Sequence, residues 1–291
     1  MSRLKDALRL LLPPVLTRLG SRLLATRFAG GKGREWEYVP DGWSYATMHP
    51  EVKGWNVQDV LDTYKQKWPQ FVSMVEGLGP LGVAHESDLT TNADVMSHNT
   101  IMVFAYVLAL TARTTERLAM LDWGGGIGHY CLLAQALLPG VEIEYHCKDV
   151  PLLAEYGARL FPRQHFCADE SCLERGYDLV MASTSLHYAE DWRALLRRLA
   201  GATRGFLYVA NVPTVWRAPS FVFLQRAYRY GYNTEYLGWC LNHAEFISAA
   251  ESAGLEPVRE FVYGHRPPIH GAPEQNSYWG YLFRAHTEDS R

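Results

Sequence analysis

Glycines at alternate positions in the stretch 122–128, Asp-Trp-Gly-Gly-Gly-Ile-Gly, constrain the fold of this chain more than any other feature. An apolar run at 118–121 precedes the stretch, and residues 129–134 after it favour a helix. A strand, a glycine turn and a helix in this order let the backbone come close to a small ligand, because glycine adopts conformations that other residues avoid. We therefore expect a ligand at this turn.

The spacing of the turn does not suit a ligand that carries phosphate. A dinucleotide turn has the form G-x-G-x-x-G, but here Gly128 comes one place early and His129 stands where the third glycine would be. No Gly-Lys-Ser/Thr follows the turn either. Instead, Asp122 lies at the end of the predicted strand, and Asp149 follows the next apolar strand, 141–145. Carboxylates accept hydrogen bonds from hydroxyl and ammonium groups, so a ligand with such groups is favoured.

The turn resembles the first motif of class I S-adenosylmethionine-dependent methyltransferases, which has the form D/E-x-G-x-G-x-G. The match covers four positions: Asp122, Gly124, Gly126 and Gly128. The resemblance implies S-adenosylmethionine as the cofactor, a ligand with a sulfonium, an amino acid and a ribose but no phosphate. It also implies that the glycine turn contacts the methionine part of the cofactor.

The same resemblance gives roles to two further carboxylates. It implies that Asp149, in Asp149-Val150-Pro151, binds the ribose hydroxyls, and that Asp169 reaches the adenine amino group. Lys148 departs from the family pattern, in which an apolar residue is commoner before the aspartate. The alternative for each carboxylate is a solvated side chain at a strand end.

Strand-like and helix-like segments alternate from residue 116 onwards, as in a doubly wound sheet. We predict strands at 118–123, 141–145, 165–168, 177–182, 205–210, 257–263 and 277–284, and helices at 129–138, 151–161, 191–199 and 242–254. The last two strands have no helix-length segment between them, which predicts an antiparallel hairpin. The predicted fold class is therefore α/β, a doubly wound, seven-stranded, Rossmann-like methyltransferase sheet over 116–291 with an N-terminal helical extension.

The loop after the fourth predicted strand carries the candidate catalytic residue. It runs from Ser183 through Leu186-His187-Tyr188, and many small-molecule methyltransferases have a similar leucine-histidine-aromatic turn there. Because ligand chemistry in open α/β sheets lies at the carboxyl ends of strands, His187 is a candidate general base. Ser183 is a candidate cofactor contact and Tyr188 a candidate substrate contact. The alternative is that His187 anchors the loop or packs on the cofactor.

Residues near the same strand ends supply the other candidates for substrate binding. These are His98, before the first predicted strand, and Asn211, Trp216 and His243, after the fifth. The segment 213–240 is dense in aromatic residues, which predicts a lid with flat faces for a sugar ring or an aromatic substrate. The alternative is that these residues belong to the core.

The first 34 residues concentrate positive charge. They hold eight lysines and arginines against one acid, Asp6, so they carry +7 and the remainder of the chain −10. Leucines at helical spacing lie between these charges, interrupted by Pro13-Pro14, which predicts a basic amphipathic arm. The arm could contact an anionic membrane, pair two copies as a homodimer or pack on its own domain. Helices are also predicted at 56–67, 69–77 and 101–112. We expect the arm and these helices to form an accessory region, residues 1–115, that covers the cofactor site.

The composition favours an enzyme of the cytoplasm. The arm would then give it peripheral contact with the inner membrane surface. Of the 291 residues 48% are hydrophobic, enough for a full core. Five cysteines lie without C-x-x-C spacing, so neither a metal site nor a disulfide framework is predicted. Beyond the arm the chain is acidic, which disfavours nucleic acid and leaves a small-molecule acceptor as the expected partner.

The pattern of the whole chain resembles uncharacterised bacterial methyltransferases of surface-polysaccharide and specialised-metabolite pathways. The shared features are the Pro-Pro start, Asp-Val-Pro at 149–151, the Ser-Leu-His-Tyr loop and Asn-His-Ala-Glu-Phe at 242–246. The resemblance implies methyl transfer to an oxygen of a sugar, a glycan precursor or a specialised metabolite. Two alternatives stay open: an N- or C-methyltransferase on an aromatic natural product, and a protein that binds S-adenosylmethionine as a scaffold or partner.

Overall fold

The computed structural model describes residues 34–83, 94–113 and 115–286. The chain divides into two compact units, Met1–Glu35 and Trp36–Arg291. The predicted basic arm, which runs through about Arg27, lies outside the described residues. The helices before residue 115 belong to the same unit as the sheet, so the predicted domain boundary at that residue does not separate two units.

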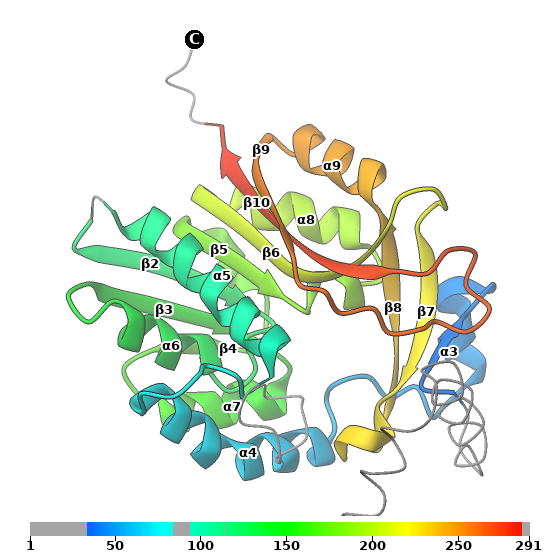
Figure 1. Cartoon of the computed structure of the whole chain (residues 1–291), viewed down its shortest axis with the longest axis horizontal. Helices are drawn as coiled ribbons and strands as arrows, with labels where there is room; N and C mark the ends of the chain where they lie inside the picture. Colours follow the sequence, from blue (N-terminus) through cyan, green and yellow to red (C-terminus); the bar gives the residue numbers. More distant parts are fainter. Residues whose placement is uncertain (1–33, 84–93, 114, 287–291) are drawn as a thin grey trace, which may run out of the picture. The chain divides into compact units, whose positions relative to one another are not determined.

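Seven strands make up the α/β core of the larger unit (Figure 1). Their order is β4-β3-β2-β5-β6-β10-β9. The bounds are β2 (Arg117–Trp123), β3 (Glu142–Lys148), β4 (His165–Cys167), β5 (Tyr177–Ser183), β6 (Thr203–Val215), β9 (Leu255–Val262) and β10 (Ser277–Ala285). Strands β2 to β6 pair in parallel, and β10 is antiparallel to β6 and β9, so the predicted C-terminal hairpin is confirmed. The strand order reverses between β2 and β5, the place where open sheets bind ligands.

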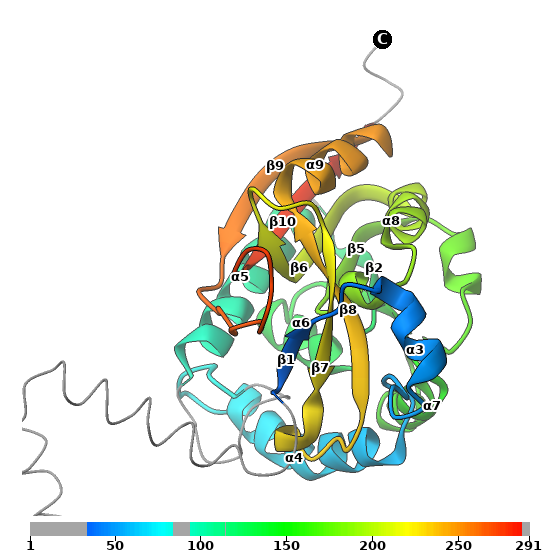
Figure 2. The same ribbon diagram turned by 90° about the vertical axis from the view of Figure 1, so that its right-hand side faces the viewer.

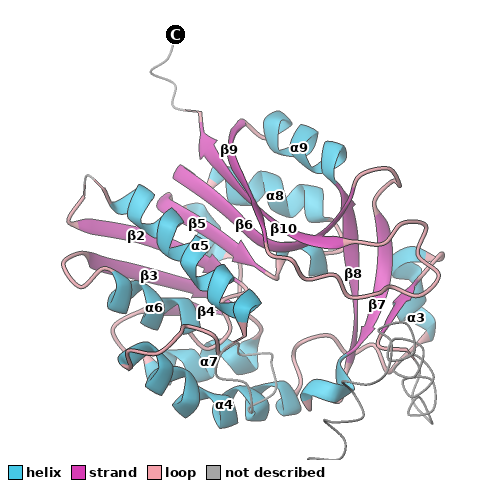
Figure 3. Cartoon of the chain, in the orientation of Figure 1, coloured by secondary structure: helices cyan, strands magenta, loops and turns pink. Residues whose placement is uncertain are grey.

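Helices cover both faces of this core (Figure 3). Helices α5 (Val95–Ala112) and α6 (His129–Leu137) contribute to one apolar cluster, and α8 (Trp192–Gly201) and α9 (His243–Ser252) to another. Alternate residues of β5 enter the two clusters: Leu179 and Met181 the first, Val180 and Ala182 the second. Strands buried on both faces are therefore apolar without alternation, as their sequences are. Helix α7 (Pro151–Leu160) packs beside β4.

Three further strands extend the sheet, so it has ten strands where seven were predicted. Figure 2 shows β1 (Trp36–Tyr38), β7 (Phe221–Arg226) and β8 (Glu235–Asn242) side by side. The first part of β6 pairs with β5 as far as Ser183, whereas its last residues, Thr214 and Val215, pair with β8. The extension thus lies beyond the carboxyl end of β5. The predicted lid segment, 213–240, is mostly strand: both faces of β7 pack in apolar clusters, so its Phe221 and Phe223 belong to the core.

The helices before β2 differ from the prediction in their limits. Helix α4 (Gln58–Glu76) is one helix with Pro69 inside it, where two were predicted, and its buried stripe includes Val60, Tyr64 and Phe71. Helix α5 begins earlier than predicted, at a cap in which Asp94 Oδ2 accepts a hydrogen bond from the Ser97 amide over 2.8 Å. Within the described residues, α5 alone is long and apolar enough to cross a membrane. Here it packs against α6, β2, β5 and β6.

Short helices occupy the connections: η1 (Gly42–Ser44), α3 (Tyr45–Met48), η2 (Ser171–Glu174), η3 (Leu186–Tyr188) and η4 (Ala227–Tyr230).

Glu274 fixes the connection from β6 to β7 and gives the first prediction. Its carboxylate accepts hydrogen bonds from the backbone amides of Trp216, Arg217 and Ala218, at 3.3, 2.8 and 2.8 Å. Burial raises the pKa of Glu274, but these amides lower it more, so the net pKa is lowered. Stability from a lowered carboxyl pKa is present above the unfolded value and lost as the pH falls through the folded value.

We predict that Glu274→Gln lowers the free energy of unfolding by about 1 to 3 kcal/mol at pH 7. The loss should shrink as the pH is lowered towards 3, because the wild-type carboxylate is then protonated as well. Urea unfolding at both pH values measures this, with the exposed Glu251→Gln in α9 as the matched control. A loss that stays constant on acidification contradicts the account.

Candidate functional site

Two adjoining cavities lie at the carboxyl ends of the central strands. The first, of about 410 Å³, is called the strand-end cavity, and its walls include Trp123, Gly124, Asp149, Val150, Glu170 and Ser183. The second, of about 400 Å³, is called the tyrosine cavity, and its walls include Tyr130, Tyr230, Tyr232, Tyr236, Tyr278 and Asn211. Thr184 and Tyr188 line both cavities. A ligand in one cavity therefore lies next to a ligand in the other.

The glycine turn between β2 and α6 needs glycine for its backbone angles and for space. Gly124, Gly126 and Gly128 have φ of 77°, 63° and 101°, in the left-handed region that other residues rarely adopt. A Cβ added to Gly124 would lie 2.3 Å from the Cβ of Ser185, and one at Gly128 would lie 2.7 Å from the ring of Phe161. The alternate glycines therefore follow from the close packing of the turn against the β5 loop and α7.

The amides of this turn donate to acceptors within the protein. Gly124 donates to the Lys148 carbonyl over 2.7 Å, Gly128 to the Gly125 carbonyl over 3.2 Å, and Gly126 to Asp149 Oδ2 over 2.6 Å. A pyrophosphate at a helix N-terminus needs such amides as donors. These three amides already have acceptors within the protein, so they are not available to a phosphate.

Asp149 presents a buried carboxylate to the strand-end cavity. It is 9% exposed, and its Oδ1 accepts a hydrogen bond from the Val150 amide over 2.6 Å in addition to the bond from Gly126. The amides thus fix its orientation in a wall that also contains Trp123, over whose ring Lys148 Nζ lies at 4.5 Å.

Asp122 lies beneath the turn, so the predicted direct contact with a cofactor is wrong. The residue is fully buried and lines neither cavity. Its Oδ2 accepts a hydrogen bond from the Tyr145 hydroxyl over 2.6 Å, and a Cβ on Gly125 would lie 2.4 Å from the same oxygen. Burial raises the pKa of Asp122 to about 7. The carboxyl therefore supports the turn from below.

The structure separates the other two predicted cofactor contacts. Ser183 lines the strand-end cavity, and its Oγ lies 3.0 Å from the Tyr130 hydroxyl. Asp169 does not line that cavity, because its carboxylate turns back to accept hydrogen bonds from the amide and hydroxyl of Ser171. The acid that follows β4 and does line the cavity is Glu170, which pairs with Arg198.

His187 lies in the core instead of on a cavity wall. It is 0% exposed and lines neither cavity. Its ring packs among those of Tyr188, Phe223 and Tyr278, with centroids 4.1 to 6.4 Å away. The η3 turn carries its side chain inward, which sequence spacing does not reveal. The geometry therefore corrects the general-base assignment and agrees with the alternative that His187 anchors the loop.

Two of the five candidates for substrate contact lie on a cavity wall, and three do not. Tyr188 and Asn211 line the tyrosine cavity. His98 accepts a hydrogen bond from the Leu81 amide over 3.2 Å, and Trp216 stacks on His243, which lies 2.7 Å from Glu260. These three residues line neither cavity, so the structure does not bring them together with the other candidates. Each fixes a connection or a helix end instead.

Two residues other than glycine adopt left-handed backbone at the junction of the cavities. Thr184 has φ of 53° and Asn211 has φ of 54°. Asn211 coincides with a register shift in the pairing of β6 with β10, between the pairs of Trp279 and Tyr281. Backbone conformations of this kind cost of order 1 to 3 kcal/mol and cluster at functional sites. Their position on the cavity walls supports a functional role for the junction.

Several cavity residues were missed from the sequence. His129 and Tyr130 follow the glycine turn directly and line the tyrosine cavity, a position that could have singled them out. Trp55 and Tyr64 reach the strand-end cavity from the region before β2. No local pattern marks these two residues, because they become neighbours of the site only through the packing of α4 and of the segment before it.

No protein-family model matches the sequence, and no curated protein matches it. Solved structures do resemble the fold. An S-adenosylmethionine-dependent methyltransferase from Clostridium acetobutylicum is 10% identical, over 65% of this chain and 92% of that chain, with a TM-score of 0.45. A protein assigned as a sarcosine dimethylglycine methyltransferase from Galdieria sulphuraria is 16% identical, over 77% and 98%, at 0.48. A sugar N-methyltransferase from Streptoalloteichus is 15% identical, over 65% and 87%, at 0.42. These similarities are distant and concern the fold alone.

The buried carboxyl of Asp122 predicts a pH-dependent stability. Its pKa rises from 3.8 to about 7 on burial, so the folded state holds a proton that the unfolded state releases. The wild type should therefore lose stability as the pH rises through the window from about 4 to 7.

We predict that Asp122→Asn removes this dependence. Between pH 5 and pH 8 the unfolding free energy of the variant should gain on that of the wild type by on the order of 1 to 4 kcal/mol. Urea unfolding at both pH values measures the difference, and Asp41→Asn, at an exposed position, is the control. If the difference between Asp122→Asn and wild type does not change with pH, the raised pKa is refuted.

Proposed function

We propose that the protein is an S-adenosylmethionine-dependent methyltransferase that holds its cofactor in the strand-end cavity and its acceptor in the tyrosine cavity. The observation that carries this proposal is the hydrogen bond from the Gly126 amide to Asp149 Oδ2. Through this bond the glycine turn holds a carboxylate, where a turn of the dinucleotide type would hold a phosphate. A second cavity that shares Thr184 and Tyr188 supplies a place for the acceptor.

The residues of the strand-end cavity fit the chemical groups of this cofactor. Asp149 is an acceptor for ribose hydroxyls, and the apolar walls of Trp123, Val150 and Leu153 suit a flat base. Gly124 contributes backbone where a side chain would not fit. When bound, S-adenosylmethionine supplies an electrophilic methyl group on a sulfonium. The protein needs to orient the acceptor and exclude water, and positioning of this kind supplies much of a rate enhancement.

The proposed acceptor is an oxygen of a small molecule such as a sugar, a glycan precursor or a specialised metabolite. The tyrosine cavity offers the flat faces of Tyr188 and Tyr236 together with the amides of Asn211 and Gln225. Aromatic faces and polar side chains together suit a ring that carries hydroxyl groups. The size of the cavity, about 400 Å³, excludes a macromolecule as the part that enters it.

A hydroxyl acceptor must lose a proton, and His129 is the proposed general base in place of His187. Among the described histidines, His129 and His265 line the tyrosine cavity. His129 is 4% exposed and follows the glycine turn, next to Tyr130, whose hydroxyl reaches Ser183 on the wall of the strand-end cavity. The His129 ring also meets that of Tyr64, which lines the strand-end cavity, with ring centroids 5.5 Å apart. A neutral imidazole can accept the proton of a hydroxyl and suits this task.

Turnover tests the proposed function directly. The protein is incubated with S-adenosylmethionine and a panel of sugars, nucleotide sugars and phenolic metabolites, and release of S-adenosylhomocysteine is measured. The methylated atom in the product distinguishes O- from N- or C-methylation. Tight binding without turnover of any acceptor in the panel would favour the scaffold alternative.

We predict that Asp149→Ala weakens S-adenosylmethionine binding about ten- to a hundredfold, because a charged hydrogen bond to hydroxyls is worth about 1.5 to 3 kcal/mol. Isothermal calorimetry measures the affinity. Asp169→Ala is the matched control and should change the affinity by less than about twofold, since Asp169 lies outside the cavity. Equal effects of the two substitutions would contradict the assignment.

We predict that His129→Asn lowers turnover about 10²- to 10⁴-fold while cofactor affinity stays within a few fold of wild type. The reason is that His129 lines the tyrosine cavity and not the strand-end cavity. Single-turnover kinetics and calorimetry separate the two effects. His265→Asn, in the same cavity, is the control, and a larger loss of turnover in that variant would transfer the role to His265.

The charge pattern of the sequence is the basis for proposals on where the protein is located and how it assembles. We propose a cytoplasmic protein whose basic arm, through about Arg27, contacts an anionic membrane or a second copy of the chain.

A further inference from the structure

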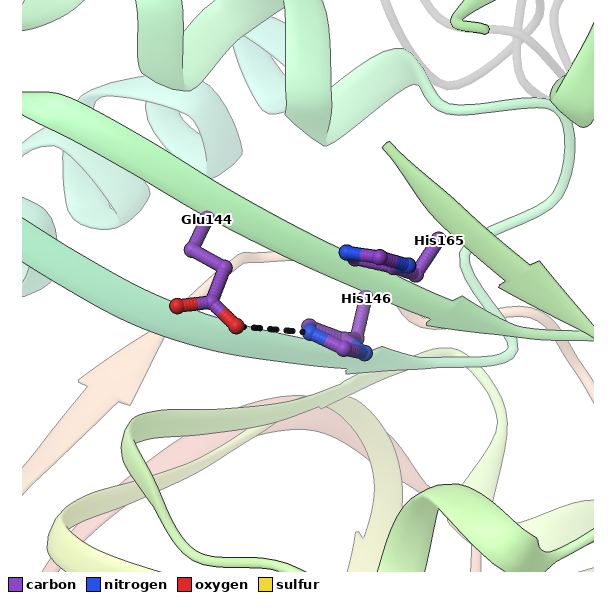
Figure 4. Close-up of side chains that lie close together, drawn as sticks. All are labelled: Glu144, His146 and His165. Carbon is purple, nitrogen blue, oxygen red and sulfur yellow. Dashed lines mark hydrogen bonds and ion pairs between the residues drawn. The ribbon is translucent and has the colours of Figure 1, made fainter. Parts of the chain in front are cut away.

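Two histidines and a glutamate lie together at the β4 edge of the sheet (Figure 4). His146 of β3 pairs in register with His165 of β4, and Glu144 precedes His146 by two residues, so it points to the same face. β4 ends the sheet order. None of the three residues lines the strand-end or the tyrosine cavity, so this cluster is separate from the proposed methyl-transfer site.

The side chains of this cluster already lie within reach of a common ligand. One ligand atom from each residue lies within 4.8 Å of those from the other two. The His146 and His165 rings stack with centroids 4.3 Å apart, and Glu144 Oε1 lies 3.1 Å from His146 Nε2. Two imidazoles and a carboxylate, with water as a further ligand, form a common donor set for zinc.

Two of the three side chains are largely shielded from solvent, and the third faces it. The side chains of His146 and Glu144 are 10% and 18% exposed. His165 is exposed and gives access from solvent.

Arg175 now occupies the position that a metal cation would take. Its Nη2 lies 2.7 Å from Glu144 Oε1, and its Nη1 lies 3.0 Å from His146 Nε2. The Arg175 side chain is 44% exposed, so it can turn out to solvent. Arg117 contacts the other carboxylate oxygen, Oε2, over 2.9 Å and leaves Oε1 to face the histidines.

We propose that Glu144, His146 and His165 form a binding site for a divalent first-row transition metal such as Zn²⁺, and that the metal displaces the Arg175 guanidinium. The spacing of the cysteines predicts no metal site, but the histidines, 19 positions apart in sequence, become neighbours only through the pairing of β3 with β4. The proposal is independent of methyl transfer.

The first experiment uses the full chain after treatment with a chelator. Zinc chloride is titrated in competition with a chromophoric zinc indicator, and the visible spectrum of the Co²⁺ form reports the ligand geometry. His165→Asn should weaken zinc binding at least about tenfold and abolish the Co²⁺ bands. His243→Asn is the matched control: His243 also pairs with a glutamate, Glu260, over 2.7 Å, but is not part of the cluster.

The second experiment tests the displacement of Arg175. Arg175→Gln removes the competing positive charge, so zinc binding should become at least about fivefold tighter. A purely structural role for the cluster predicts the opposite sign, since loss of Arg175 would loosen the side chains. Unchanged zinc affinity in His165→Asn, or weaker affinity in Arg175→Gln, overturns the proposal. Affinity for S-adenosylhomocysteine, measured in parallel, should be equal in all variants, which separates this test from that of the proposed function.

Discussion

The hydrogen bond between the Gly126 amide and the carboxylate of Asp149 ties the end of β3 to the turn after β2. The shape of the site depends on it, because the same contact fixes the left-handed turn and orients the acid in the strand-end cavity. A hydrogen bond with an ionised partner, shielded from water, is among the stronger contacts in a protein. Asp122 completes the arrangement from below: its bond with Tyr145 holds the two strands together beneath the turn.

The unusual length of β6 controls the second half of the site. Because β6 continues past the end of β5, it pairs with β8 and places the β7–β8 extension over the strand ends. The side chains of Gln225 and Tyr236 from that extension then line the tyrosine cavity. The left-handed backbone of Asn211 lies at the point where β6 passes the end of β5. One long strand thus builds the wall that the proposed acceptor would contact.

The order of strands and helices after residue 116 could be predicted, because strands buried on both faces and the glycine turn leave local signals. The Asn242 cap of α9, which accepts a hydrogen bond from the Glu245 amide, is such a signal and was confirmed. The β7–β8 extension could not be recognised, since a dense aromatic segment suits a lid as well as a strand. His187 and Asp169 were misplaced for a different reason: sequence position gives the strand end but not the direction in which the side chain points. His146 and His165 were missed because strand pairing alone brings them together.

The central claim is that the strand-end cavity selects S-adenosylmethionine chemistry over phosphate chemistry. Calorimetric titration of the full chain with S-adenosylhomocysteine and, separately, with NAD⁺ tests it most directly, since both ligands carry adenosine and only the second carries pyrophosphate. The account predicts saturable one-to-one binding of S-adenosylhomocysteine and no measurable binding of NAD⁺. Equal or tighter binding of NAD⁺ would contradict it.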